Sequence, residues 1–116
     1  GLKKALVLMD EIRKEFETNL FVPHVEGVNI ELEKALRLND FITMGKLVAI
    51  DAIHREESCG GHFREEHQTE DEAKRDDQNC FYVSCWEYQG EDKNPVKFEE
   101  PLKYEAIEVK TRNYKS

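Results

Sequence analysis

The sequence has no hydrophobic run long enough to cross a membrane. Its 116 residues contain no apolar stretch approaching the roughly 20 residues that a membrane-spanning helix needs. The start, Gly1-Leu2-Lys3-Lys4, lacks the apolar segment and cleavage pattern of a signal peptide. We therefore expect a soluble, intracellular protein, and the length fits one domain with a modest core.

Basic residues and cysteines are also scarce. Acidic residues outnumber basic ones by 25 to 17, which gives a formal net charge of −8. Such acidity argues against nonspecific binding to nucleic acid or to an anionic membrane surface. The three cysteines are too few, and odd in number, for a disulfide scaffold. We expect reduced thiols and no nucleic-acid partner.

The first half of the chain has the periodicity of helices. Apolar residues at helical spacing predict an amphipathic helix over residues 2–18. After a helix-breaking segment, Asn29 is a candidate N-cap for a second helix over about 30–38. Asn39 and its neighbour indicate a stop and restart, with a third helix over about 40–57. The expected fold class is mainly α, a three-helix bundle.

The third predicted helix is more apolar than a three-helix bundle requires. From Phe41 to Ile53 it is apolar almost all the way round, and two short amphipathic helices shield only part of its circumference. Something else must cover the rest. Either the C-terminal half of the chain folds back over it, or a surface outside this chain does.

The second half of the chain combines a polar loop with extended segments. Residues 58–79 are strongly polar and without periodicity, which predicts a long loop that carries function, lies on a partner or is simply solvated. Alternation of residue types after position 80, with a turn at 90–95, predicts a small β-hairpin or extended tail over 80–114.

Cysteine and histidine residues suggest two kinds of chemistry. Residues 59–62 (Cys-Gly-Gly-His) have zinc-knuckle spacing, and Cys80 and Cys85 could complete a tetrahedral site. Five residues apart in a strand, these two cysteines would point to opposite faces, so we expect no metal. A nucleophile made of Cys59 and His62 is disfavoured because the flanking glutamates oppose formation of a thiolate.

Residues 55–64 (Arg-Glu-Glu-Ser-Cys-Gly-Gly-His-Phe-Arg) and 75–79 (Arg-Asp-Asp-Gln-Asn) form two ordered, charged motifs. They resemble a signature of the C-terminal domain of succinate dehydrogenase/fumarate reductase flavoproteins, where Glu-Ser-Arg-Gly-Ala-His-x-Arg precedes Arg-Asp-Asp-Glu-Asn. The resemblance extends upstream to a helix pair and downstream to residues 112–114 (Arg-Asn-Tyr). In two departures from this pattern, Cys59 replaces the usual arginine and the spacing between the motifs is longer than in many relatives.

The resemblance implies a function for a larger protein. In this family a flavin domain with two dinucleotide folds holds FAD covalently on a histidine, a capping domain closes on the dicarboxylate, and hydride passes between substrate and flavin. These parts precede the C-terminal domain, so the resemblance implies no catalytic, cofactor-binding or metal-binding residue on this chain. The residues agree, since neither a Gly-x-Gly-x-x-Gly loop nor a dicarboxylate-binding His/Arg cluster is recognisable.

The resemblance also implies partners and a location. In the family this domain is a three-helix bundle with an extended tail, packed against the flavin-binding domain near the iron-sulfur subunit. The parent enzyme would take part in electron transport and the tricarboxylic acid cycle. It would be cytoplasmic and peripheral to the inner membrane, touching the membrane only indirectly through an anchor subunit.

We predict that the two motifs form an ion-paired junction with the flavin-binding domain, because arginines are planar donors suited to bidentate pairing with carboxylates. We also expect the histidine of this set to hydrogen-bond across the junction. The alternative is a set of exposed ion pairs, each worth about 0–1 kcal/mol. The predicted interface residues, called the charged cluster below, are Arg55, Glu56, Glu57, Ser58, Gly60, His62, Arg64, Arg75, Asp76 and Asp77.

Two other functions stay open at this point. The same domain occurs in related flavoproteins such as L-aspartate oxidase and adenylylsulfate reductase, although the long polar loop and the Arg-Asp-Asp motif favour succinate and fumarate. The chain could also be a free-standing interaction module, with or without structural zinc, that has no link to redox chemistry.

Overall fold

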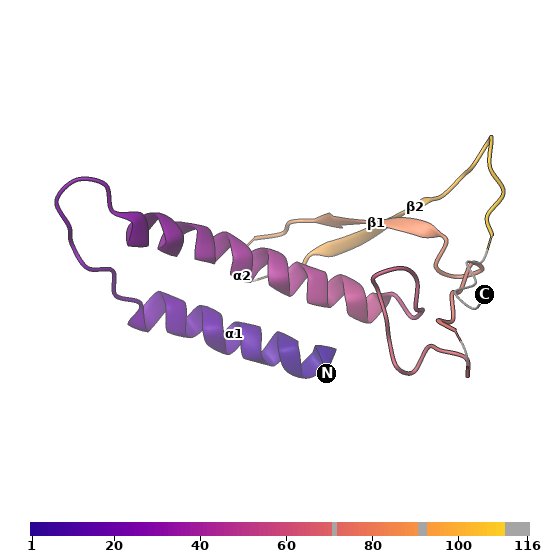
Figure 1. Ribbon diagram of the computed structural model, residues 1–116, viewed down its shortest axis with the longest axis horizontal. Coiled ribbons are helices and arrows are strands. Elements are labelled where there is room, and N and C mark those ends of the chain that lie inside the picture. The colour runs from indigo at the N-terminus through magenta and orange to yellow at the C-terminus, as the bar shows by residue number, and fades with distance from the viewer. Residues whose placement is uncertain (71, 91–92, 111–116) are drawn as a thin grey trace. The chain divides into compact units, whose positions relative to one another are not determined.

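A computed structural model describes residues 1–70, 72–90 and 93–110. In chain order the elements are helix α1 (Leu2–Asn19), helix α2 (Ile30–His54), strand β1 (Tyr82–Glu87) and strand β2 (Val96–Pro101) (Figure 1). The chain divides into two compact units, Gly1–His54 and Arg55–Ser116, which we call the helical unit and the polar unit. The fold is mainly helical, with one two-stranded sheet.

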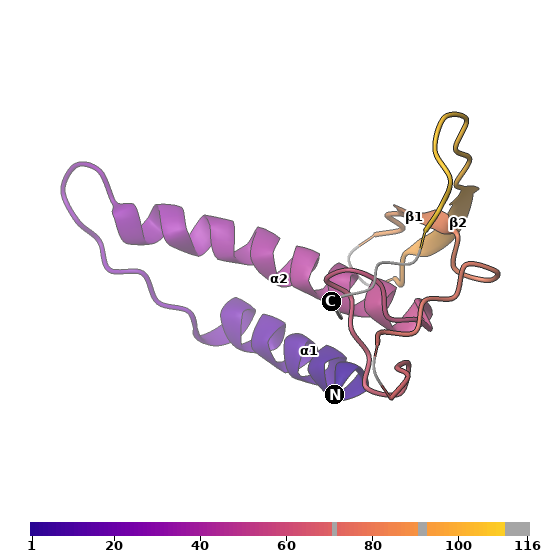
Figure 2. The same cartoon turned by 45° about the vertical axis from the view of Figure 1, so that its right-hand side comes forward.

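In the helical unit, α1 and α2 run antiparallel as a hairpin (Figure 2). Polar contacts join the two helices. Arg13 of α1 donates to Asn39 Oδ1 at 3.0 Å and to Thr43 Oγ1 at 2.5 Å. Near Gly45 the helices approach closely, since Met9 Cε lies 3.3 Å from where a Cβ at Gly45 would stand.

The expected N-cap of α2 is confirmed. Asn29 Oδ1 accepts a hydrogen bond from Leu32 N at 3.0 Å, which satisfies one of the free N–H groups of the first turn. The same side chain donates to Pro23 O at 2.8 Å, and Gly27, with φ at 86°, turns the chain toward the helix. Sequence reasoning located this helix start correctly.

The predicted three-helix bundle is wrong, because the segments expected at 30–38 and 40–57 form one continuous helix. Asn39 does not interrupt it: its side chain accepts from Arg13 of α1, and its carbonyl accepts from Thr43 Oγ1 at 3.1 Å. An asparagine whose side chain has a tertiary partner is tolerated inside a helix. The helix also ends at His54 rather than at position 57.

The helical unit leaves much apolar surface exposed. Only Ile42 and Ala49 are buried among its hydrophobic side chains. Phe41, Met44 and Val48 follow the i, i+3, i+7 spacing of one helix face and are 63%, 56% and 63% exposed. None of the described helices is both long and apolar enough to span a bilayer.

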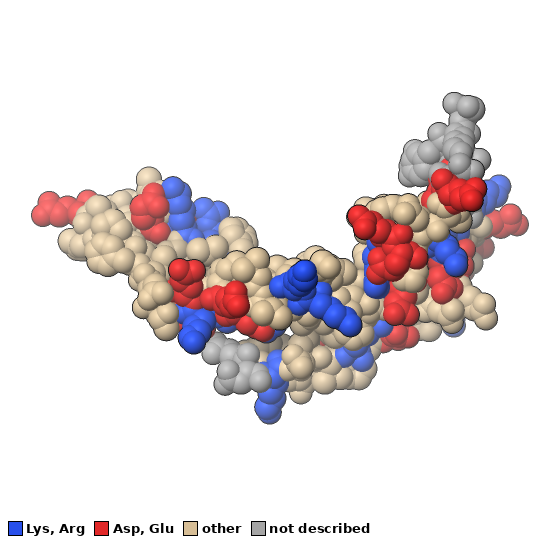
Figure 3. All heavy atoms as spheres, turned by 90° about the horizontal axis from the view of Figure 1, so that it is seen from below, with Lys and Arg blue, Asp and Glu red and all other residues tan. Residues whose placement is uncertain are grey.

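Acidic side chains are prominent on the face drawn in Figure 3, in keeping with the net charge.

In the polar unit, β1 and β2 form the expected antiparallel hairpin, in a register that pairs Tyr82 with Pro101 and Glu87 with Val96. Residues 58–70 and 72–79 contain turns and two isolated bridges, Cys59 with His62 and Gln68 with Ala73, in place of helix or strand. Residues 112–114, which carry part of the family resemblance, lie outside the described residues.

Candidate functional site

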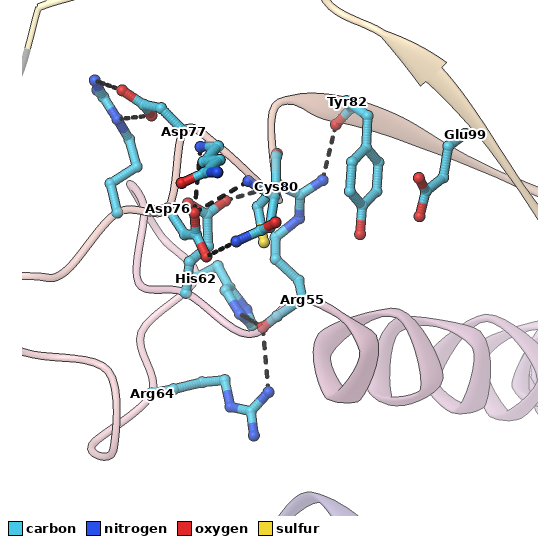
Figure 4. A network of polar contacts seen from close by, with 12 residues as sticks. Arg55, His62, Arg64, Asp76, Asp77, Cys80, Tyr82 and Glu99 are labelled. Atoms are coloured by element: carbon cyan, nitrogen blue, oxygen red, sulfur yellow. Dashed lines mark hydrogen bonds and ion pairs between the residues drawn. The ribbon is translucent and has the colours of Figure 1, made fainter.

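Arg55, directly after α2, links two segments of the polar unit. One guanidinium nitrogen donates to Glu57 Oε1 at 2.8 Å and to Cys80 O at 2.9 Å. The other donates to Tyr82 O at 2.9 Å, and the guanidinium carbon lies 5.0 Å from the centre of the Tyr82 ring (Figure 4). The bonds to backbone carbonyls anchor the start of β1 to the residue that follows the helix.

Glu57 is a buried carboxylate with partners on both oxygens. It is 3% exposed, and while Oε1 pairs with Arg55, Oε2 accepts from Asp76 N at 2.8 Å. A buried charge is tolerated only when it is paired and hydrogen-bonded, and both conditions hold here. Glu57 thereby joins the first motif of the charged cluster to the second.

Ser58 is the most buried side chain of the cluster, at 1% exposed. Its hydroxyl accepts from Arg64 N at 2.8 Å and donates to Arg64 O at 3.1 Å, while its own N–H donates to Lys74 O at 2.8 Å. One serine thus closes the loop from residue 58 to residue 64 and ties it to residue 74.

His62 ends the tight turn that Gly60 makes possible. Cys59 and His62 exchange two backbone hydrogen bonds, of 2.8 and 3.1 Å, and Gly60 adopts φ of 58°, a conformation that favours glycine. The ring Nε2 of His62 lies 2.9 Å from Arg55 O (Figure 4). The turn therefore folds back onto Arg55, the first residue of the polar unit, through the histidine.

Arg64 is held by Glu66 and by the backbone carbonyl of Arg55. Its guanidinium pairs with Glu66 Oε1 at 2.5 Å, and Nη1 donates to Arg55 O at 3.2 Å. A backbone hydrogen bond at Glu66 itself, and then the bond from Arg64, hold the pKa of the Glu66 carboxyl below its usual value. Glu66 was not among the predicted acceptors, and its only sequence signal was a carboxylate two residues after an arginine.

The second motif contains an ion pair and a capped turn. Arg75 pairs with both carboxylate oxygens of Asp77 and donates to Lys110 O at 3.2 Å; the bond to Asp77 raises the pKa of Arg75. Asp76 accepts from the side chain and backbone N–H of Asn79, each at 3.0 Å, and these bonds lower the pKa of Asp76. Both carboxylates of the motif are committed to partners inside the polar unit.

The structure therefore brings the predicted residues together in one unit. The expected guanidinium–carboxylate pairing occurs for Arg55 with Glu57 and for Arg75 with Asp77. Glu56 is exposed and makes no side-chain hydrogen bond or ion pair with residues 1–70, 72–90 or 93–110. Whether the charged cluster lies at a domain interface stays a prediction, because these contacts are all within the polar unit.

Sequence reasoning missed a second polar group on the sheet. Lys97 Nζ donates to Tyr82 OH at 2.7 Å and to Glu99 Oε1 at 2.8 Å. Desolvation lowers the pKa of Lys97, but the bonds to Glu99 and Tyr82 outweigh it and raise that pKa above its ordinary value. With Arg55 also near the Tyr82 ring, this phenol connects the charged cluster to β2. The sequence signal was strand alternation, which places alternate residues on one face.

The three cysteines do not converge. Cys59 and Cys85 are exposed and Cys80 is buried, with burial raising the pKa of its thiol. Within the described ranges, no group of three or more His, Cys, Asp or Glu side chains is arranged to hold a metal ion. The charged cluster pairs hydrogen-bond donors with acceptors inside the polar unit. Such pairing suits a rigid connection between segments.

Comparison with known proteins links this chain to flavoproteins. A family model described as the fumarate reductase flavoprotein C-terminus matches residues 1–114. An uncharacterized FAD-dependent oxidoreductase of Methanocaldococcus jannaschii is 41% identical over 66 residues, which are 57% of this chain and 11% of that relative. The match therefore spans a small part of the relative's length. No solved structure matches the chain.

Proposed function

The chain belongs to the fumarate reductase flavoprotein C-terminal family, and from this premise we propose that it is the C-terminal domain of a succinate dehydrogenase/fumarate reductase flavoprotein. The observation that carries the proposal is the family match over residues 1–114, nearly the whole chain. The relationship to an FAD-dependent oxidoreductase supports the same class of parent enzyme. That parent would interconvert succinate and fumarate and pass electrons through FAD to an iron-sulfur subunit.

The described residues do not fit FAD themselves. A dinucleotide site needs a strand, a glycine-rich turn and a helix whose N-terminus faces the phosphates. Here both helices precede both strands, and the first turn of α2 carries Glu31 and Glu33, which would repel a pyrophosphate. We therefore assign FAD and the catalytic residues to other parts of the parent polypeptide.

We propose that the role of this domain is structural and at an interface. The polar unit is held by its own buried charges, whereas the helical unit exposes apolar residues such as Phe41, Met44 and Val48. Exposed apolar surface of this kind is typical of a protein–protein or domain–domain contact. The proposed partners are the flavin-binding domain of the same polypeptide and the iron-sulfur subunit, in a cytoplasmic complex attached to the inner membrane through an anchor subunit.

The test uses the full-length polypeptide that contains this chain. We expect it to purify with FAD and to oxidise succinate or reduce fumarate, whereas residues 1–116 alone bind no flavin and are inactive. Turnover of L-aspartate instead would assign the parent to a related flavoprotein. A full-length protein without flavin would overturn the proposal and leave a free-standing interaction module, for which bound zinc is the next measurement.

The interface role is tested by Arg64→Ala in the full-length protein, with Arg37→Ala as the matched control. Arg64 is 16% exposed and bonds within the charged cluster, while Arg37 pairs with Glu33 on the helical unit and is 60% exposed. If the cluster is desolvated in the parent, stranding a charge costs roughly 3–5 kcal/mol, against about 0–1 kcal/mol for an exposed pair. We expect lower thermal stability and flavin content for Arg64→Ala alone. Two variants equal to wild type would contradict the interface role.

A further inference from the structure

The hydrogen bond from His62 to a backbone carbonyl fixes the tautomer of its neutral ring. Nε2 lies 2.9 Å from Arg55 O, and a carbonyl oxygen only accepts, so Nε2 must carry the hydrogen (Figure 4). In the neutral ring, the other nitrogen, Nδ1, then has a free lone pair and is a hydrogen-bond acceptor. The backbone of this unit therefore sets which ring nitrogen is the acceptor.

Nδ1 of His62 is available to a partner. Among residues 1–70, 72–90 and 93–110 no hydrogen bond or ion pair reaches this atom. In the same ranges every buried side-chain nitrogen or oxygen has a partner, so Nδ1 is not sealed inside the unit. The acceptor is accessible from outside although the ring is half-buried.

The position of the ring is fixed in advance by its neighbours. The paired backbone bonds between Cys59 and His62 set the turn, and Ser58 ties its base to Arg64. A Cβ at Gly60 or Gly61 would meet no atom within 4 Å, so the turn is open at both glycines. A preorganised acceptor loses little conformational entropy when it binds.

We propose that Nδ1 of His62 accepts a hydrogen bond from an N–H or O–H donor of the flavin-binding domain, which makes His62 a docking residue. This inference rests on the proposed function, because it takes its partner from the same polypeptide. The two ring nitrogens then have separate tasks: Nε2 closes the turn onto Arg55, and Nδ1 joins the turn to the neighbouring domain.

Two substitutions separate these tasks. In His62→Gln the side-chain amide nitrogen takes the place of Nε2 and donates to Arg55 O, while the acceptor at Nδ1 is lost. In His62→Asn the amide lies near the place of Nδ1 and supplies an acceptor, while the bond to Arg55 O is lost. The experiment is hydrogen exchange, followed by mass spectrometry, on the full-length polypeptide with bound FAD.

For His62→Gln we expect exchange in peptides covering residues 55–64 to stay as in wild type, while at least one flavin-domain peptide exchanges about tenfold faster. His62→Asn should give the opposite pattern, with faster exchange in residues 55–64. If His62→Gln changes no flavin-domain peptide, the docking role is overturned. That outcome differs from failure of the proposed function, in which the wild-type full-length protein holds no FAD.

Discussion

The two units of this chain are stabilised in opposite ways. The helical unit buries only two hydrophobic side chains and exposes many others, and the polar contacts of Arg13 help to join its two helices. In the polar unit the most buried side chains are Glu57 and Ser58, at 3% and 1% exposed, each with its hydrogen bonds satisfied. One unit lacks cover for apolar surface, and the other is ordered around buried polar groups.

A domain inside a larger protein needs both affinity for its neighbours and a defined orientation against them. Covering apolar surface with a partner lowers the free energy by roughly 25 cal/mol per Å², but it places little constraint on the orientation of the two surfaces. A buried polar network adds little net free energy and tolerates few alternative arrangements. Under the proposed interface role, the helical unit would supply affinity for neighbouring domains and the polar unit would supply orientation.

The largest expected effect comes from Glu57→Ala in the polar unit. It removes the carboxylate that pairs with Arg55 and takes the acceptor from Asp76 N, both inside a buried network. We expect a loss of about 3 kcal/mol, at the low end of the range for broken buried pairs because the Arg55 side chain is still 20% exposed. The single tryptophan, Trp86 in β1, reports unfolding of this unit by fluorescence in urea.

Circular dichroism of the same samples follows the helices and thus the helical unit. If the two units are stabilised separately, Glu57→Ala shifts the fluorescence midpoint and leaves the helical transition in place. Glu57→Gln is the matched control, since it keeps an oxygen for Asp76 N while removing the charge. A midpoint for Glu57→Ala within error of wild type would show that the buried pair does not hold the polar unit together.

The second effect is that of Ser58→Ala. The hydroxyl both accepts from Arg64 N and donates to Arg64 O, so its removal takes the acceptor from Arg64 N next to a buried position, while Arg64 O keeps the bond from His67 N. We expect a loss of about 2 kcal/mol, measured as above from the urea midpoint of Trp86 fluorescence. Ser84→Ala, on the half-buried face of β1, is the control. Equal losses for both serines would mean that the Arg64 bonds contribute nothing specific.

Elements set by local sequence were predicted closely, and elements set by distant partners were not. Helix α1 was expected over 2–18 and spans Leu2–Asn19, and the Asn29 cap depends only on its own neighbours. The false break at Asn39 came from its ordinary preference for helix ends. That preference was overridden by Arg13, a residue 26 positions earlier in the chain.

The same distinction applies to the charged cluster. Charge and order in the motifs predicted that the arginines would pair with nearby carboxylates, and the structure shows this for Arg55 with Glu57 and for Arg75 with Asp77, whose members are two residues apart. The contacts of Arg55 with Cys80 O and Tyr82 O span 25 and 27 residues, and acceptance by backbone carbonyls leaves no trace in residue type. The partnership of Tyr82 with Lys97 depends on strand register, which the sequence did not specify.

The third prediction tests the helical unit with a stabilising change. Gly45→Ala should gain up to about 1 kcal/mol of helix propensity inside α2. The new Cβ would lie 3.3 Å from Met9 Cε, the mobile end of a flexible side chain, which needs to move by only a few tenths of an ångström. We expect a higher midpoint for the helical transition and no change in Trp86 fluorescence. A lower midpoint would show that the helices cannot separate at this contact.

The smallest expected effect is a change in acid sensitivity at Asp76. Hydrogen bonds from the side chain and backbone N–H of Asn79 lower the pKa of Asp76 below its ordinary value of 3.8. A carboxyl with a lower pKa when folded stabilises the fold above its unfolded value, and this contribution is lost as the pH falls through the folded value. Wild type should therefore lose more stability than Asp76→Asn as the pH falls below about 4.

The measurement is the urea midpoint of Trp86 fluorescence for both proteins from neutral pH down to the acid transition. Asp40→Asn, at an exposed position of α2, is the control, and its acid dependence should follow that of wild type. The difference in urea midpoint between wild type and Asp76→Asn should become smaller as the pH falls, because a protonated aspartate accepts hydrogen bonds no better than the amide does. Curves for wild type and Asp76→Asn that stay parallel at every pH would mean that Asp76 has the same pKa folded and unfolded, and that its turn is held by other contacts.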